Sequence, residues 1–168
     1  MKLRIAKTVA ASLLFGLVSG AAMADASIGV GISHGTSSSA ATGGLEASRI
    51  YVPIKPASNN LWFEPYLSIS NTSNKGTTRS IGLGTGIFVD FAKTQNTQAY
   101  YGGRIGLVNS SAPGGKSDTG IELAPAIGFG YLPAKNIMFG AEAGIALISG
   151  DGTYIGTQTG LFARYFFD

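Results

Sequence analysis

The C-terminal stretch 158-QTGLFARYFFD-168 decides the fold that this sequence predicts. Side chains alternate between the two faces of a β-strand. One face of this stretch carries Leu161, Ala163, Tyr165 and Phe167, and the other carries Gln158, Gly160, Phe162, Arg164 and Phe166. The first face suits lipid, whereas hydrocarbon would reject the glutamine and the arginine of the second. The stretch therefore predicts one strand of a transmembrane β-barrel, with lipid outside and polar groups inside.

The N-terminus has the three features of a secretory signal peptide. A positively charged region precedes a mostly apolar run and a small-x-small cleavage pattern: Lys2, Arg4 and Lys7, then residues 9–18, then Ala22-Met23-Ala24. The apolar run is shorter than the roughly 20 residues of a spanning helix. We therefore expect residues 1–24 to be a cleaved signal peptide and residues 25–168 to form one barrel domain.

Charge and composition exclude several classes of protein. The chain has 12 Lys and Arg against 9 Asp and Glu, and three of the cations lie in the predicted signal peptide, which leaves nine of each. A near-neutral mature chain gives no support to nucleic-acid binding. The absence of cysteine excludes a disulfide framework and a thiolate metal site, and one histidine cannot make a multi-histidine zinc site. We expect no metal, no cofactor and no nucleic-acid partner.

Eight alternating segments follow one another along the mature chain, separated by turn-forming residues. In each segment, apolar side chains on one face alternate with glycine, polar or charged side chains on the other. The segments are residues 27–33, 47–54, 61–70, 80–91, 99–108, 121–131, 137–148 and 158–168. Most are close to the 9 to 11 or so residues that a tilted membrane strand needs. The sequence thus predicts an all-β, eight-stranded, antiparallel up-and-down barrel.

The connections between the segments are of two kinds. One set is compact and rich in Pro, Asn and Lys: residues 55–60, 92–96 and 133–136. The other set is mostly longer and rich in Ser, Gly and Thr: residues 34–44, 71–78, 109–118 and 149–153. Short periplasmic turns opposite longer external loops are typical of outer-membrane barrels. We expect the second set to face outward, where these loops could bind a surface ligand.

The alternation directs seven charged side chains into the barrel: Arg49, Glu64, Asp90, Arg104, Glu122, Glu142 and Arg164. We expect them to form a charge network, because an unpaired charge in a narrow lumen is costly. An ion path or a general acid/base pair is the functional alternative. The interior of an eight-stranded barrel is just wide enough to be filled by side chains, which favours a structural plug.

Glycines and aromatic residues also point inward. Six of the inward positions are Gly82, Gly84, Gly86, Gly128, Gly130 and Gly144. They suggest either a small water-filled cavity or relief of crowding between strongly coiled strands, and we favour the second. Tyr51, Trp62 and Tyr66 have inward parity and are expected to pack the lumen.

Catalytic and nucleotide-binding motifs fail on spacing or context. Gly115-Lys116-Ser117 ends like a phosphate-binding loop, but Ser110 stands where the first glycine is required. His34 is the single candidate base for Ser-His-Asp chemistry. We interpret it as an exposed histidine at the rim of the barrel and predict no catalytic residue.

The signal peptide, the eight segments, the loop asymmetry and the terminal stripe of Leu161, Ala163, Tyr165 and Phe167 together resemble the small outer-membrane β-barrel superfamily. This superfamily includes outer membrane protein A-like, X-like and opacity-protein-like barrels. The resemblance covers essentially the whole mature chain and rests on pattern. It implies location in the Gram-negative outer membrane and contact with outer-membrane lipid and lipopolysaccharide. In the family, the barrel-assembly machinery reads the terminal aromatic stripe; here Asp168 follows Phe167, where family members usually end on the aromatic residue.

The resemblance implies a non-enzymatic structural or surface-interaction role, such as that of an adhesin. A narrow porin-like channel is one alternative, and it predicts conductance that changes when Arg104 or Glu122 is neutralised. A lipid A-modifying enzyme is another, with His34, Ser37 and Ser117 as the visible candidate residues. A secreted soluble β-sandwich would need polar outward faces, whereas here the outward faces are apolar.

Overall fold

The computed structural model of the protein describes residues 26–39, 43–57, 60–73, 77–111, 117–150 and 153–167. The predicted signal peptide and Asp168 lie outside these residues. Within them, no helix is long and apolar enough to cross a membrane.

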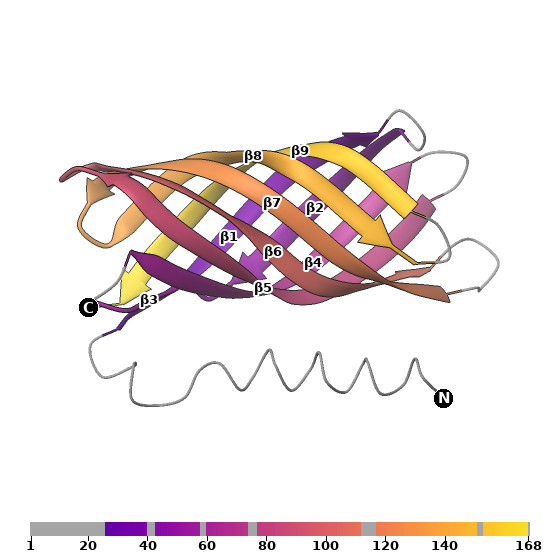
Figure 1. The fold of residues 1–168 in the computed structure, drawn as a ribbon, viewed down its shortest axis with the longest axis horizontal. Coiled ribbons are helices and arrows are strands. Elements are labelled where there is room, and N and C mark those ends of the chain that lie inside the picture. Colours follow the sequence, from indigo (N-terminus) through magenta and orange to yellow (C-terminus); the bar gives the residue numbers. More distant parts are fainter. Residues whose placement is uncertain are drawn as a thin grey trace.

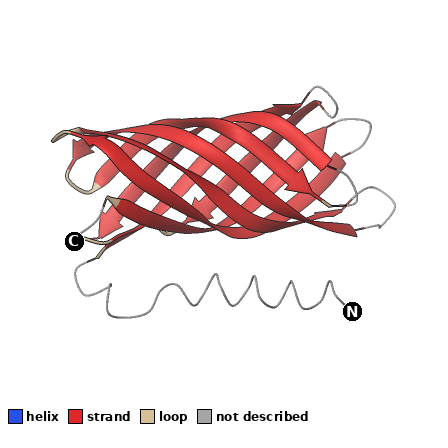
Figure 2. Ribbon diagram, viewed as in Figure 1, coloured by secondary structure: helices blue, strands red, loops and turns tan. Residues whose placement is uncertain are grey.

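The regular structure of the described residues consists of β-strands (Figure 2). The strands are β1 (Ser27–Ser39), β2 (Gly43–Tyr51), β3 (Ile54–Lys55), β4 (Leu61–Ser73), β5 (Thr77–Lys93), β6 (Thr97–Ser111), β7 (Ser117–Ala134), β8 (Ile137–Ser149) and β9 (Thr153–Phe167). Both β2 and β3 lie between β1 and β4, so they are two parts of one wall strand. The interruption falls at Val52 and Pro53, where the proline has no backbone N–H to donate to a neighbouring strand.

The sheet closes on itself to form a barrel. Each wall strand pairs antiparallel with the next, and β9 returns to β1 with a register that runs from Ile28↔Phe167 to Ser38↔Thr157. The strands cross the barrel at a marked tilt, and β9 lies beside β1 (Figure 1). Closure leaves no sheet edge with unpaired backbone groups, which a lipid environment requires. The predicted barrel of eight wall strands is confirmed.

The two faces of the wall differ as the alternation predicts. Isoleucine, leucine, phenylalanine and tyrosine side chains cover the outside, among them Ile81, Leu83, Ile121, Leu123 and Phe129. Aromatic and charged side chains fill the inside. Tyr51, Trp62 and Tyr66 are buried there, as predicted from their parity.

The predicted external loops are shorter than expected. Residues 34–39 and 43–44 of the first loop belong to β1 and β2, and the ends of the loops at 71–78, 109–118 and 149–153 likewise belong to strands. The residues left between strands there are 40–42, 74–76, 112–116 and 150–152. These stretches are close in length to the opposite turns at 56–60, 94–96 and 135–136, so the predicted marked asymmetry in loop length is wrong. Serine, glycine and threonine were interpreted as loop formers, but they continue the backbone pairing of the long hairpins.

Candidate functional site

The lumen contains a column of paired charges, and β4 sets its order. Trp62, Glu64 and Tyr66 are successive inward residues of this strand, so they lie at successive levels along the barrel. Each one contacts a different group of polar side chains from strands on the other sides of the lumen.

At the first level, Asp90 accepts hydrogen bonds from two neighbours. Trp62 Nε1 donates to Asp90 Oδ1 over 2.8 Å, and Gln98 Nε2 donates to the same oxygen over 2.5 Å. Lys55 Nζ lies 3.9 Å from Asp90 Oδ2 and donates to Gln98 Oε1 over 2.6 Å. This cluster satisfies the Asp90 carboxylate close to the end of the barrel where β1 begins and β9 ends (Figure 1).

At the second level, two arginines and two glutamates form a four-membered network. Arg164 Nε donates to Glu64 Oε1 over 2.7 Å, and Arg164 Nη2 lies 3.2 Å from Glu142 Oε1. Arg104 Nη2 lies 3.1 Å from Glu64 Oε2, and Arg104 Nη1 lies 2.7 Å from Glu142 Oε2. Tyr100 joins them by donating to Glu142 Oε1 over 2.6 Å. Each carboxylate therefore bridges both guanidinium groups, an arrangement that offsets the cost of removing four charges from water.

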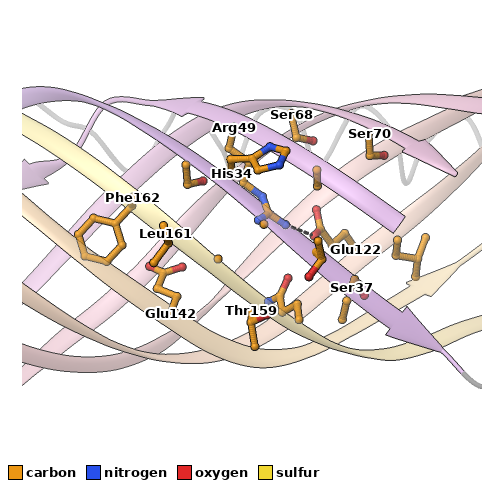
Figure 3. Close-up of a pocket in the computed structure, with 18 of the residues that line it drawn as sticks. His34, Ser37, Arg49, Ser68, Ser70, Glu122, Glu142, Thr159, Leu161 and Phe162 are labelled. Carbon is orange, nitrogen blue, oxygen red and sulfur yellow. Dashed lines mark hydrogen bonds and ion pairs between the residues drawn. The ribbon is translucent and has the colours of Figure 1, made fainter. Parts of the chain in front are cut away.

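At the third level, Glu122 is held by two groups. Arg49 Nη2 donates to Glu122 Oε1 over 3.0 Å, and the Tyr66 hydroxyl donates to Glu122 Oε2 over 2.7 Å. Figure 3 shows the Arg49 and Glu122 side chains meeting across the lumen. The structure thus places all seven predicted interior charges in the lumen, each with a partner of opposite charge.

Aromatic rings close the lumen around Arg164. Its guanidinium carbon lies 3.9 Å from the ring centroid of Phe162 and 4.7 Å from that of Trp62. The Trp62 ring in turn contacts Phe88 and Tyr100, with centroids 4.9 and 5.0 Å away. Cation–π contacts and ring packing of this kind hold these side chains together within the lumen at this level.

Inward glycines make room for these rings. A Cβ at Gly84 would lie 2.6 Å from both Cζ and Oη of Tyr66, and Gly128 faces the ring of Tyr100 in the same way. These two glycines therefore leave space that an aromatic side chain of a neighbouring strand fills. At Gly84 and Gly144 the atom nearest to an added Cβ is a backbone oxygen of a neighbouring strand, Ile105 O and Pro125 O, which agrees with the favoured interpretation of relief of crowding between strands.

A small cavity remains between the third level and the far end of the barrel. Its volume is about 50 Å³, and its walls include Ser37, Ser68, Arg49, Glu122 and Tyr154. Figure 3 shows Ser37, Ser68 and Ser70 around the ion pair. A water molecule needs about 10–15 Å³ by this kind of measure, so the cavity accommodates a few waters.

Lys55 and Gln98 are lumen residues that the sequence interpretation missed. Lys55 was assigned to the compact connection at residues 55–60, which is rich in Pro, Asn and Lys. The two-residue strand β3 instead continues the inward alternation of β2 past Pro53, so Tyr51, Pro53 and Lys55 all point inward. If the alternation of inward and outward residues had been continued past Pro53, it would have identified Lys55 as a lumen residue.

His34 and Ser37 lie on opposite faces of β1. His34 is exposed on the outside of the barrel, where its Nδ1 lies 3.0 Å from Ser48 Oγ. Ser37 is buried in the lumen, where its Oγ lies 2.6 Å from the Tyr154 hydroxyl. The prediction of an exposed His34 is confirmed, but it lies on the outer wall and not in a rim loop. These two residues, suggested for lipid A modification, therefore cannot act on one substrate.

The terminal stripe lies on the outer face of β9. Leu161, Tyr165 and Phe167 are exposed, and Ala163 is half-buried between its neighbours. The Tyr165 and Phe167 rings contact each other with centroids 5.5 Å apart.

Solved structures of other proteins share this barrel. No protein-family model and no curated protein matches the sequence. Neisserial surface protein A is 18% identical over 86% of this chain and 98% of its own, with a TM-score of 0.66. The attachment invasion locus protein of Yersinia pestis is 15% identical over 84% of this chain and 97% of its own, with a TM-score of 0.50. The N-terminal β-barrel domain of Pseudomonas aeruginosa OprF is 15% identical over 83% and 97%, also with a TM-score of 0.50.

At these identities, the likeness establishes a shared architecture. Its coverage of nearly the whole of each matched chain agrees with the closed sheet described above. The chain therefore has the fold of the small bacterial outer-membrane β-barrels.

Proposed function

We propose that this protein is a non-enzymatic barrel of the bacterial outer membrane, with a structural and surface-interaction role. The observation that carries the proposal is the filled lumen. Three levels of paired charges and a cluster of aromatic rings cross the interior, and the cavity beyond them has a volume of about 50 Å³. A barrel filled in this way is a stable structural component of the membrane, and it interacts with other molecules through its outer surface and its rim.

The outer wall supports the membrane location. Large apolar side chains such as Ile81, Ile121 and Phe129 are more than half exposed, and exposed apolar side chains recur on every wall strand. In water this surface would be an aggregation liability, whereas in hydrocarbon it is the expected surface of a spanning barrel.

The external rim supports the surface-interaction role. The strands extend beyond the apolar band as hydroxyl-rich hairpins, in which Ser80 and Ser110 bond to each other and Asn109 bonds to Thr119. The similar proteins from Neisseria and Yersinia pestis are named as a surface protein and as an attachment invasion locus protein. We assign the binding of a surface ligand to the ends of these hairpins, within residues 34–44, 71–78, 109–118 and 149–153.

A planar-bilayer recording tests the filled lumen directly. Protein purified from an outer-membrane fraction is first shown to be folded by its shift in gel mobility on boiling. We expect no conductance steps from this protein. Discrete steps that change size in Glu122→Gln or Arg104→Gln would replace the structural role with that of a narrow channel.

A cell-adhesion assay tests the surface-interaction role. Cells that produce the protein are compared with cells producing a variant in which a Gly-Ser linker replaces residues 112–116. The control variant carries Gly-Ser in place of Gln95-Asn96, which lie between β5 and β6 at the opposite end of the barrel. We expect reduced attachment to an epithelial monolayer with the first variant alone, and equal attachment by both variants and wild type would refute the role.

A further inference from the structure

One sector of the outer wall is polar, where β9, β1 and β2 lie side by side (Figure 1). Outward positions in this sector hold hydroxyl, imidazole and carboxylate groups: Thr157, Thr159, His34, Thr36, Ser38, Ser48 and Glu46, all exposed. On the other wall strands, the corresponding outward positions are mainly isoleucine and leucine. We name this set of seven residues the polar sector.

Most of the polar sector lies within the apolar band, whereas Glu46 pairs with Asn71 and lies toward the rim. Thr157 pairs with Ile145 on β8, and Ser48 pairs with Ile69 on β4; both isoleucines are about half exposed. On β9 itself, exposed Leu161 and Ile155 flank the two threonines on either side. The polar groups therefore face the hydrocarbon side of the wall, in the half nearer the external rim.

Some of these groups bond to one another and others do not. His34 bonds to Ser48, and Ser38 Oγ lies 3.1 Å from Thr157 Oγ1. Thr36, Thr159 and Glu46 make no side-chain hydrogen bond within the part of the chain that the structure describes. A polar group without a partner in lipid is costly, so a hydrogen-bonding molecule from the membrane would stabilise this surface.

An apolar groove of about 630 Å³ begins at the polar sector and runs across the outer wall. His34, Thr36 and Thr159 line one end, and Phe91, Ile127, Phe129, Ala141, Ala143 and Leu161 line the rest. The groove follows successive pairs on neighbouring strands, Phe129↔Ala141, Ala141↔Leu161 and Leu161↔His34. Ala141 and Ala143 form a low floor between larger side chains, which gives a hydrocarbon chain a place to lie.

We propose that this site binds one glycolipid of the outer leaflet. An acyl chain lies in the groove, and the amide and hydroxyl groups that link it to an aminosugar bond to His34, Thr36, Thr159 and Glu46. This inference rests on the proposed outer-membrane location.

The charge of the sector favours this occupant over two others. Arg49 and Arg164 point into the lumen, so β8, β9, β1 and β2 present no outward cation among the described residues. A lipid phosphate in the groove would therefore meet Glu46 and no cation of these four strands, because outward Arg79 lies on β5, two strands beyond Glu46 across Asn71. Sugar hydroxyl and amide N–H groups can donate to the Glu46 carboxylate. A second copy of this chain would likewise bring no cation to Glu46 through the same surface.

Native mass spectrometry of the folded barrel, released from detergent micelles, tests the proposal. The probes are a synthetic phosphate-free diacylated glucosamine and a phosphatidylglycerol with the same acyl chains. The polar sector is removed in His34→Leu/Thr159→Val, and the groove is filled in Ala143→Leu. The matched control is Thr85→Val, on the outward face of β5, away from the groove.

We expect wild type and Thr85→Val to retain the glucosamine lipid about three- to ten-fold better than phosphatidylglycerol, the ordinary worth of one or two hydrogen bonds. The double variant should lose that preference, and Ala143→Leu should bind both lipids less. Equal retention by wild type and the double variant would overturn the proposal. A dimer that the double variant abolishes would also overturn it and would identify a second copy as the occupant.

The shift in gel mobility on boiling separates the two proposals. If the shift persists while the lipid preference is absent, the lipid site is wrong and the outer-membrane barrel stands. If the wild-type protein is recovered soluble without a shift, the proposed location fails, and the lipid site fails with it.

Discussion

Replacing Arg164 with methionine should destabilise the barrel more than any other single removal of a lumen cation. Arg164 is buried, and it contacts Glu64 at 2.7 Å, Glu142 at 3.2 Å and the Tyr100 hydroxyl at 3.0 Å. In Arg164→Met, Arg104 at 3.1 Å would be the one cation left beside fully buried Glu64 among the residues that the structure describes. Breaking a buried ion pair by removing one partner costs about 3–5 kcal/mol. We expect a loss of that size in the free energy of unfolding.

Urea unfolding in lipid vesicles, followed by tryptophan fluorescence, measures this loss. Trp62 is the single tryptophan of the chain, and its ring lies 4.7 Å from the guanidinium carbon of Arg164. It therefore reports on the network itself. The matched control is Arg79→Met, because Arg79 is exposed and an exposed substitution usually changes stability by less than about 0.5 kcal/mol.

A double-mutant cycle decides whether the loss comes from the excess of negative charge. In Arg164→Met, Arg104 faces both Glu64 and Glu142, and Glu64→Gln removes one of these two carboxylate charges. The double variant should therefore lose less than the sum of the single losses, by about 1 kcal/mol or more. A loss below about 1 kcal/mol for Arg164→Met, or strictly additive losses, would refute the account of the lumen as a mutually dependent network.

Three further predictions concern other parts of the barrel. Lys55→Met should cost only about 1–2 kcal/mol, because Asp90 keeps its hydrogen bonds from Trp62 and Gln98; an unfolding loss as large as that of Arg164→Met would contradict this. Gly84→Ala should cost about 1–3 kcal/mol in the same assay, because its Cβ would overlap the Tyr66 ring, and wild-type stability would show that the ring moves freely. Phe167→Ala should reduce the amount of folded protein in outer membranes, measured as the heat-shifted band, if the terminal stripe guides assembly; an unchanged amount would exclude that role.

The alternation of side chains along each strand predicted many of the lumen residues as well as the fold. Arg49, Glu122 and the other charged residues could be assigned to the lumen because a strand has a period of two and hydrocarbon excludes charge. Their partners could not be assigned. Glu64 bonds to Arg164, 100 positions away in sequence. Such contacts depend on the tilt of the strands and on the register between them, and the sequence pattern of a single strand contains neither.

The loops and the polar sector show where local composition misleads. Serine, glycine and threonine are common in loops, so residues 34–39 were interpreted as part of a loop, yet backbone pairing to β2 and β9 keeps them in β1. That error concealed the outward position of His34, and with it the contact to Ser48. Hydrogen bonds to two neighbouring strands outweigh the weak intrinsic preference of such residues.

By itself, the sequence determined that the wall would be an eight-stranded barrel with an apolar outside and a charged inside. The physical reason is that the side of the wall to which a side chain points is a local property. It follows from the two-residue period of a strand and from the polarity of each side chain. The tertiary structure alone decided which charges pair, how aromatic rings over glycines close the lumen, and where a polar sector meets an apolar groove. These features depend on register and closure, which bring distant residues to the same level of the barrel.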